Sequence, residues 1–253
     1  MSVAVSKTEA TERSLKTASA TGISFSSGVT GQNDSALLRW DLSTPIQAVF
    51  LDFDGTLVDS ESLHYEAWSA AVAPHGGGTG WEDYERRFVG KSDRWAGRVF
   101  LEEAGHAPDD AFVLEVCQAK HAYYRLRSPE RLRIADDVLE VLLGAPAELA
   151  LGVVSSSPAV DVQPTLTLSG LHARLDVVVC GDQVTRLKPD PEPYLTAVQR
   201  VAASRGLQIA PEAAVVFEDS QTGMASARAA GMRVIQVEKP SLLAGLLRAA
   251  LAR

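Results

Sequence analysis

The sequence has few cysteines and no long apolar run. Its 253 residues include two cysteines, Cys117 and Cys180, which lie far apart and lack the spacing of metal ligands. We interpret both as small buried hydrophobic residues of a protein in a reducing compartment. A disulfide between them is the alternative. No apolar run approaches the roughly 20 residues that cross a bilayer, so no membrane association is expected.

Positive charge is scarce as well. The 24 Lys and Arg residues are outnumbered by 32 Asp and Glu residues, and the formal net charge is −8. This balance argues against a nucleic-acid-binding protein, which usually carries a basic face. A phosphorylated ligand stays compatible with it, because a bound cation would offset the repulsion locally. We expect a cytoplasmic monomer whose partner is a small molecule.

The first 44 residues are poor in large apolar residues and show no lasting periodicity. They are rich in Ser, Thr, Ala and Gly, a composition that predicts a disordered tail over residues 1–44. The alternative is an organelle transit peptide, which is rich in Ser and Arg and poor in acidic residues. Glu9, Glu12 and the single Arg13 before Arg39 count against it.

From residue 46 onward, short apolar runs alternate with helical periodicity. Strands are expected at Gln47–Asp52, Ala150–Ser155, Asp176–Cys180, Ala214–Glu218 and Arg233–Val237. Helices are expected at Pro191–Arg205 and Gln221–Ala230, the second closed by Gly231. Strands of this length joined through helices predict an α/β fold with a doubly wound parallel sheet.

One interval breaks the alternation. Residues 62–135 contain no convincing strand, and helices are expected there at His64–Ala73, Trp81–Val89, Arg94–Ala104 and Pro108–Arg127. A helical insertion directly after the first strand predicts a cap domain over the carboxyl edge of the sheet, where ligands bind in open α/β folds. The core is then divided into residues 45–61 and 136–253.

The first strand ends on two aspartates that are separated by one residue, Asp52 and Asp54. Alternate side chains of a strand share a face, so both should project near one point, and Gly55 then allows a sharp turn. Two carboxylates at the end of a buried strand are costly without a partner, and Mg²⁺ suits an oxygen-rich site. A solvated acidic turn is the alternative.

Three other strand ends carry polar groups. The run Ser155–Ser157 ends the second strand and could hold a phosphate or simply cap the next helix. Lys188 follows the third strand, where neighbouring prolines would fix its position, and Glu218 and Asp219 end the fourth. All four ends face one crevice in a doubly wound sheet, and a chance match at four ends is much rarer than at one. We therefore expect an active site there.

With these motifs in this order, the chain resembles the haloacid dehalogenase superfamily. It is similar to the branch that inserts a helical cap after the first motif, which includes β-phosphoglucomutase and sugar-phosphate phosphatases. The resemblance covers about residues 46–240. The matching motifs are Asp52-Phe53-Asp54-Gly55-Thr56-Leu57-Val58-Asp59-Ser60, Ser155, Lys188-Pro189-x-Pro191 and Glu218-Asp219-Ser220-x-x-Gly223.

The resemblance implies phosphoryl transfer with Mg²⁺ as the cofactor. Asp52 would be the nucleophile that forms an aspartyl-phosphate, and Asp54 would be the general acid and then the general base. The second aspartate also argues against dehalogenation, because a halide leaves without a proton.

Further residues would hold the metal and the phosphoryl group. The resemblance implies metal binding by Asp52, the main-chain carbonyl of Asp54, and Asp219, with Glu218 as a ligand or a neighbouring acceptor. It implies phosphate binding by Ser155, Ser156 and Lys188.

In the predicted cap, the resemblance implies substrate contacts for His64, Lys91 and Lys120. The alternatives are a packing role for His64 and a surface position for each lysine. Trp68 is expected in the core of the cap.

Departures from the mutase pattern favour a phosphatase. Asp93 stands where the mutase carries a basic residue, and Pro158 and Ala159 replace its lysine and asparagine. A mutase must hold a second phosphate in two orientations, so the loss of these donors weakens that activity. We expect a phosphatase of a small phosphorylated metabolite, in the first place a sugar phosphate. β-Phosphoglucomutase is the alternative, and a non-catalytic phosphometabolite-binding module is the third.

Overall fold

The computed structural model describes residues 44–206 and 208–252. Apart from Thr44, the predicted disordered tail and the transit-peptide alternative lie outside these residues. Among the helices within them, none is both long and apolar enough to cross a membrane.

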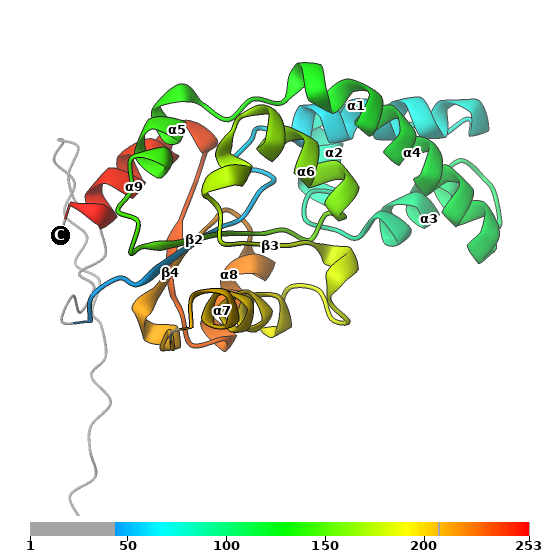
Figure 1. Cartoon of the computed structure of the whole chain (residues 1–253). Helices are drawn as coiled ribbons and strands as arrows, with labels where there is room; N and C mark the ends of the chain where they lie inside the picture. Colours follow the sequence, from blue (N-terminus) through cyan, green and yellow to red (C-terminus); the bar gives the residue numbers. More distant parts are fainter. Residues whose placement is uncertain (1–43, 207, 253) are drawn as a thin grey trace, which may run out of the picture. The chain divides into compact units, whose positions relative to one another are not determined.

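A five-stranded parallel sheet with the order β3-β2-β1-β4-β5 forms the centre of the fold (Figure 1). Its strands are β1 (Ala48–Leu51), β2 (Ala150–Val154), β3 (Val177–Val179), β4 (Ala214–Glu218) and β5 (Arg233–Gln236). The predicted strands differ from these by at most one residue at either end, and the predicted fold class is confirmed. The strand order reverses between β1 and β4, which makes their carboxyl ends the expected place for a ligand.

Helices cover both faces of the sheet (Figure 1). On one face lie α5 (Asp136–Leu143), α6 (Ala159–Leu168) and α9 (Leu243–Leu251), and on the other lie α7 (Glu192–Arg205) and α8 (Gln221–Ala229). Short 3-10 turns lie at Ala73–His75, Leu171–Arg174, Gly181–Gln183, Pro211–Ala213 and Pro240–Leu242. Gly231, with a φ of 80°, follows α8 as predicted.

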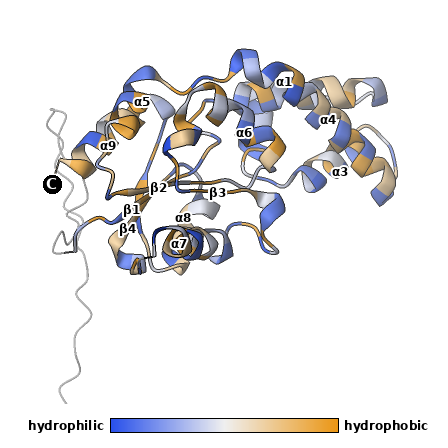
Figure 2. Cartoon of the chain, in the orientation of Figure 1, coloured by the Kyte–Doolittle hydropathy of each residue, from blue (hydrophilic) through white to orange (hydrophobic). Residues whose placement is uncertain are grey.

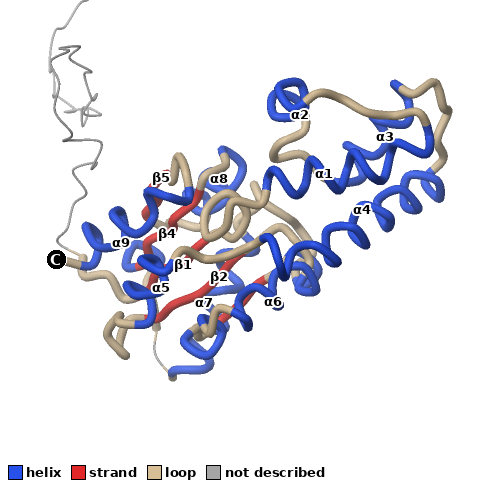
Figure 3. Tube along the Cα trace, turned by 90° about the horizontal axis from the view of Figure 1, so that it is seen from above, coloured by secondary structure: helices blue, strands red, loops and turns tan. Residues whose placement is uncertain are grey.

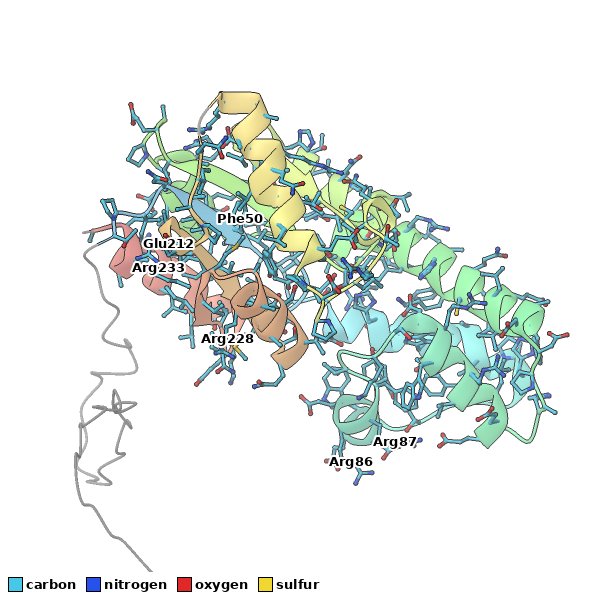
Figure 4. The ribbon with its side chains drawn as sticks, turned by 90° about the horizontal axis from the view of Figure 1, so that it is seen from below. Phe50, Arg86, Arg87, Glu212, Arg228 and Arg233 are labelled. Carbon is cyan, nitrogen blue, oxygen red and sulfur yellow. The ribbon has the colours of Figure 1, made fainter. Side chains whose placement is uncertain are left out.

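The two layers enclose separate hydrophobic cores. Val49 and Leu51 of β1 belong to one core, whereas Phe50, labelled in Figure 4, belongs to the other. This division follows from the alternation of side chains along a strand. Figure 2 shows the same pattern as hydrophobic colour on the strands and hydrophilic colour on the outer helix faces. Because both faces are covered, β1, β2 and β4 are buried along their whole length.

The long connection from β1 to α5 contains four helices, which we call the helical insertion: α1 (Glu61–Val72), α2 (Trp81–Arg87), α3 (Asp93–Glu103) and α4 (Asp110–Arg131). Figure 3 shows them grouped beside the sheet. They share a hydrophobic cluster of their own, which includes Phe88 and Phe100. Trp68 belongs to this cluster and is 3% exposed, so its predicted place in the core is confirmed.

Several bounds of the helices differ from the prediction. Helix α1 begins at Glu61 rather than His64, and α2 ends at Arg87 rather than Val89. The last helix of the insertion runs to Arg131 rather than Arg127, with Pro129 inside it. Proline lacks the N–H of a helical turn and normally favours a helix end, so this extension has no local signal. Helices α5, α6 and α9 are also additions to the helices for which the sequence pattern specified bounds.

Candidate active site

The turn after β1 places the first acidic motif. The Gly55 amide donates to the Val58 carbonyl at 2.9 Å, and the φ of Gly55 is +76°. A Cβ on Gly55 would lie 2.2 Å from Asp219 Oδ2, so a side chain here would collide with the acidic pair of β4. Glycine is therefore required both for the backbone conformation and for the close approach of two strand ends.

Lys188 joins the carboxyl ends of β1, β2 and β4. Its Nζ donates to Asp52 Oδ1 at 2.7 Å, to Glu218 Oε2 at 2.7 Å and to the Val154 carbonyl at 2.9 Å. Its side chain is only 4% exposed. Burial alone would lower the pKa of Lys188, but the negative charges of Asp52 and Glu218 raise it well above its ordinary value. The lysine is therefore a fixed ammonium, as the proline-rich approach predicted.

Glu218 is the most fully hydrogen-bonded group of the site. Its Oε2 accepts from Lys188 and from the Tyr194 hydroxyl, the latter at 3.0 Å. Its Oε1 accepts from the amide and the hydroxyl of Ser220, at 3.0 and 2.8 Å. A Cβ on Gly223 would lie 1.9 Å from Glu218 Oε2, so this glycine leaves room for the carboxylate. These bonds indicate that Glu218 acts as an acceptor that positions Lys188, rather than as a metal ligand.

Three carboxylates gather beside this lysine. Asp52, Glu218 and Asp219 each offer an oxygen, and these oxygens lie within 4.8 Å of one another. Burial and the charge of Glu218 raise the pKa of Asp219 to about 7, and the same causes raise that of Asp52. The cluster therefore holds more negative charge than Lys188 offsets. An all-oxygen donor set with surplus negative charge fits a hard divalent cation such as Mg²⁺.

Asp54 points to different partners from Asp52. Its Oδ1 accepts from the Ser60 hydroxyl at 2.6 Å and lies 3.3 Å from His64 Nε2, while its Oδ2 accepts from the Ser157 hydroxyl at 2.7 Å. Burial alone would raise the pKa of Asp54, but the hydrogen bonds from His64, Ser60 and Ser157 lower it to about 2. The two aspartates thus share a strand end but not an environment.

The three serines after β2 differ in exposure and in their contacts. Ser155 is 2% exposed, and its hydroxyl accepts from the Ser157 amide at 3.0 Å. Ser156 is exposed, and Ser157 contacts Asp54. The N-cap of α6 is Pro158, which makes no side-chain cap, so the alternative of a plain helix cap is not what the structure shows.

The residues of the helical insertion that were predicted to contact the substrate lie in three different environments. His64 reaches Asp54 and stacks on Tyr124, with ring centres 4.4 Å apart. Lys120 is 3% exposed and pairs with Asp93 at 3.0 Å. Lys91 is exposed, and its Nζ lies 5.8 Å from the ring centre of Trp95. His64 therefore lies in the site. Lys120 is buried beside Asp93 and does not contact Asp52 or Asp54, and Lys91 lies at the surface.

Sequence reasoning missed three contacts of the site, namely those of Ser60, Ser157 and Tyr194. Ser60 and Ser157 both donate to Asp54, and Tyr194 donates to Glu218. All three lie inside or next to motifs that were singled out, but spacing alone does not say which hydroxyl of a turn reaches a carboxylate.

The family model of haloacid dehalogenase-like hydrolases matches residues 49–237. The chain is 33% identical to Protein CbbY of Rhodobacter capsulatus over 199 residues, which covers 75% of this chain and 84% of that protein. It is also 33% identical to Phosphorylated carbohydrates phosphatase of Thermotoga maritima over 198 residues, with coverage of 75% and 84%.

The solved structures give the same picture of the fold. The crystal structure of CbbY from Rhodobacter sphaeroides in complex with phosphate is similar, with a TM-score of 0.64 and 25% sequence identity. The match covers 76% of this chain and 85% of that one.

Proposed function

The chain belongs to the haloacid dehalogenase-like hydrolase family as a phosphoric monoester hydrolase, and we propose that it releases phosphate from a small sugar phosphate. The reaction would pass through an aspartyl-phosphate on Asp52, with Mg²⁺ as the cofactor. The observation that carries the proposal is the buried Lys188 bridge between Asp52 and Glu218, directly beside Asp219 and at the same sheet edge as Asp54.

Asp52 and Asp54 divide the two steps between them. In the first step, a carboxylate oxygen of Asp52 bonds to phosphorus as the bond to the sugar oxygen breaks, and Asp54 gives its proton to that oxygen. In the second, Asp54 takes a proton from water, whose oxygen bonds to phosphorus and releases phosphate from Asp52. Burial opposes the hydrogen bonds that keep Asp54 ionised, so a substrate that displaces them favours the protonated form needed first.

The other residues supply charge and position. Lys188 offsets negative charge on the phosphoryl oxygens, and Glu218 holds it in place. Ser155 and Ser156 would donate to the same oxygens from the turn after β2. When bound by Asp52, Asp219 and the Asp54 carbonyl, Mg²⁺ would supply the remaining positive charge.

We also propose that residues 62–135 act as a cap domain that excludes bulk water during the reaction. His64 supports this proposal, because it comes from the insertion and contacts Asp54 of the core. A second contact joins Arg125 of α4 to Asp161 of α6 at 3.8 Å. The cytoplasmic location and the monomeric state stay predictions.

The choice of a sugar phosphate is supported by the Thermotoga relative, which is named for phosphorylated carbohydrates. The mutase alternative is less well supported, because Asp93 forms an ion pair with Lys120 and would repel a second phosphate. Pro158 and Ala159 provide no side-chain donors for one.

A substrate panel tests the proposal. Sugar phosphates and para-nitrophenyl phosphate are incubated with the protein and Mg²⁺, and released phosphate is measured beside the same reactions with a chelator and with the Asp52→Asn variant. We expect phosphate release that needs both Mg²⁺ and Asp52. Conversion of β-glucose 1-phosphate to glucose 6-phosphate without phosphate release would establish the mutase instead.

A further inference from the structure

A second group of charged residues, of which Lys120 and Asp161 are buried, lies where the helical insertion meets α6. The carboxylate of Asp93 accepts from Lys120 Nζ at 3.0 and 3.1 Å and is also hydrogen-bonded to His121 Nε2. Arg125, one turn further along α4, lies 3.8 Å from Asp161 Oδ1. We call these five residues the Asp93–Asp161 cluster.

This cluster borders the active site on the side of Asp54. His64 contacts Asp54 and stacks on the ring of Tyr124. Lys120 Nζ lies 5.7 Å from the centre of the same ring. A continuous set of contacts therefore runs from the general acid to the cluster. A leaving group that takes its proton from Asp54 would have its far end near these charges.

Asp161 has an unfilled hydrogen-bonding position. The residue is 4% exposed, yet its Oδ1 accepts no hydrogen bond from any residue in the described part of the chain. One helical turn further along α6, the Thr165 hydroxyl is buried in the same way without a partner. Buried polar groups are nearly always hydrogen-bonded, so these two atoms indicate donors or acceptors that arrive with a ligand. For a carboxylate oxygen, the missing partner is a donor.

The lysine and the arginine of this cluster each have a carboxylate partner. Lys120 and Arg125 are matched by the carboxylates of Asp93 and Asp161. Glu61 adds a further carboxyl group that lies close enough to interact electrostatically with Lys120. A second phosphate would need unpaired cations, and here each cation already faces a carboxylate. Placing another anion beside these carboxylates is strongly unfavourable.

We propose that Asp93 and Asp161 make the enzyme selective for monophosphates with an uncharged, hydroxyl-bearing leaving group and exclude bisphosphates. This inference rests on the proposed function and names two specificity-determining residues outside the catalytic set. A substrate hydroxyl donates to Asp161 Oδ1, while Asp93 keeps Lys120 neutralised. Selectivity then comes from an attractive contact for one substrate class and a repulsive one for the other.

Matched pairs of sugars test this inference. The kcat/KM for phosphate release is measured for fructose 6-phosphate against fructose 1,6-bisphosphate, and for glucose 1-phosphate against glucose 1,6-bisphosphate. We expect the wild-type protein to prefer the monophosphate by about tenfold or more. In Asp93→Asn and in Asp161→Asn this preference should fall about tenfold. The exposed Asp110, paired with Arg98 on the same insertion, provides the control variant Asp110→Asn, which should keep the wild-type preference.

The outcomes separate the inference from the function on which it rests. Equal or better turnover of bisphosphates by the wild-type protein overturns the inference, as does a preference that both variants leave unchanged. If phosphate is released from none of the substrates, para-nitrophenyl phosphate included, the proposed function fails. Calorimetric binding of the same pairs to Asp52→Asn then decides the inference, which is overturned if the bisphosphate binds as tightly as the monophosphate. Far-ultraviolet circular dichroism checks that each variant is folded.

Discussion

Lys188 and Lys120 are equally buried lysines in two regions of the molecule, each 4% exposed in its side chain. Lys188, at the sheet edge, donates to two carboxylates and a backbone carbonyl. Lys120, in the helical insertion, has one carboxylate partner and lies over the rings of Trp68 and Tyr124, with its Nζ 5.7 Å from each ring centre. Burial alone therefore does not distinguish the two lysines.

The difference lies in what surrounds each ammonium group. Around Lys188 there are more carboxylates than one lysine can neutralise, which leaves a place for a cation and a phosphoryl group. Around Lys120 the charges are paired, and its Nζ lies near two aromatic rings. We infer that the first region performs the chemistry and that the second recognises the rest of the substrate.

The largest effect is expected from Asp52→Asn. The amide cannot form the covalent intermediate, so kcat should fall by about 10⁴-fold or more. Lys188 would keep its bond to Glu218, so the fold should be retained. The checks are steady-state kinetics and the thermal unfolding midpoint. Substantial residual turnover in a folded variant would refute the assignment of the nucleophile.

The second prediction compares the two lysines directly, through Lys188→Met and Lys120→Met. Removal of Lys188 leaves two buried carboxylates facing each other, which should cost about 3–5 kcal/mol of stability and reduce kcat by 10²-fold or more, roughly. Removal of Lys120 should mainly raise KM, because it lies beside the substrate rather than the reacting phosphorus. Urea unfolding and initial rates measure both. Similar losses of kcat in the two variants would contradict the different roles assigned to Lys188 and Lys120.

A smaller effect is expected from Tyr194→Phe, which removes one of the hydrogen bonds to Glu218 and leaves Lys188 in place. Loss of a single buried hydrogen bond should cost about 1 kcal/mol. The rate should fall only slightly, since the remaining three bonds still hold the carboxylate. If kcat instead fell as far as in Lys188→Met, Tyr194 would have a direct role in catalysis.

The smallest effect on kcat is expected at an ion pair near the amino ends of β2 and β3. Asp176 accepts from Arg205 at 2.7 Å through two nitrogens and from the Leu151 amide at 2.8 Å. Burial opposes these bonds, but they lower the pKa of Asp176 below its ordinary value of 3.8. The native state thus favours the ionised carboxyl, which stabilises the fold above about pH 4 and stops doing so as the pH falls through the lowered value.

Asp176→Asn should therefore destabilise the protein by about 1–2 kcal/mol at pH 7 and by less at pH 3. Urea unfolding at both values measures the difference, and kcat should stay unchanged. An equal loss of stability at both pH values would show that the charge of Asp176 does not matter.

The sequence predicted the sheet, and the gathering of polar side chains at its carboxyl edge, for a physical reason. Asp52 follows β1 directly and Glu218 is the last residue of β4, and neighbouring parallel strands bring such residues together whatever the details of packing. Lys188 reaches the same edge from the loop after β3. The partners of Asp54 were harder to predict. Ser157, rather than Ser155 or Ser156, reaches its carboxylate, and this depends on the path of one turn.

The insertion was the least predictable part of the site. Its helices follow from periodicity, but the pairing of Asp93 with Lys120 and His121 joins residues more than 25 positions apart on two helices. Asp161 gave no signal at all, because a lone carboxylate in the first turn of a helix normally lies in solvent. Such contacts depend on how two helices are packed, which local patterns do not encode.

The most direct test of the central claim is to detect the phosphoryl group on Asp52. The Asp54→Asn variant is mixed with para-nitrophenyl phosphate and Mg²⁺, because this leaving group needs no proton while loss of the general base slows hydrolysis of the intermediate. The reaction is quenched in acid and digested for mass spectrometry. We predict a phosphoryl group on the peptide that contains Asp52, and none in the double variant that also carries Asp52→Asn. Phosphate release without any labelled aspartate, or a label on another residue, would contradict the account.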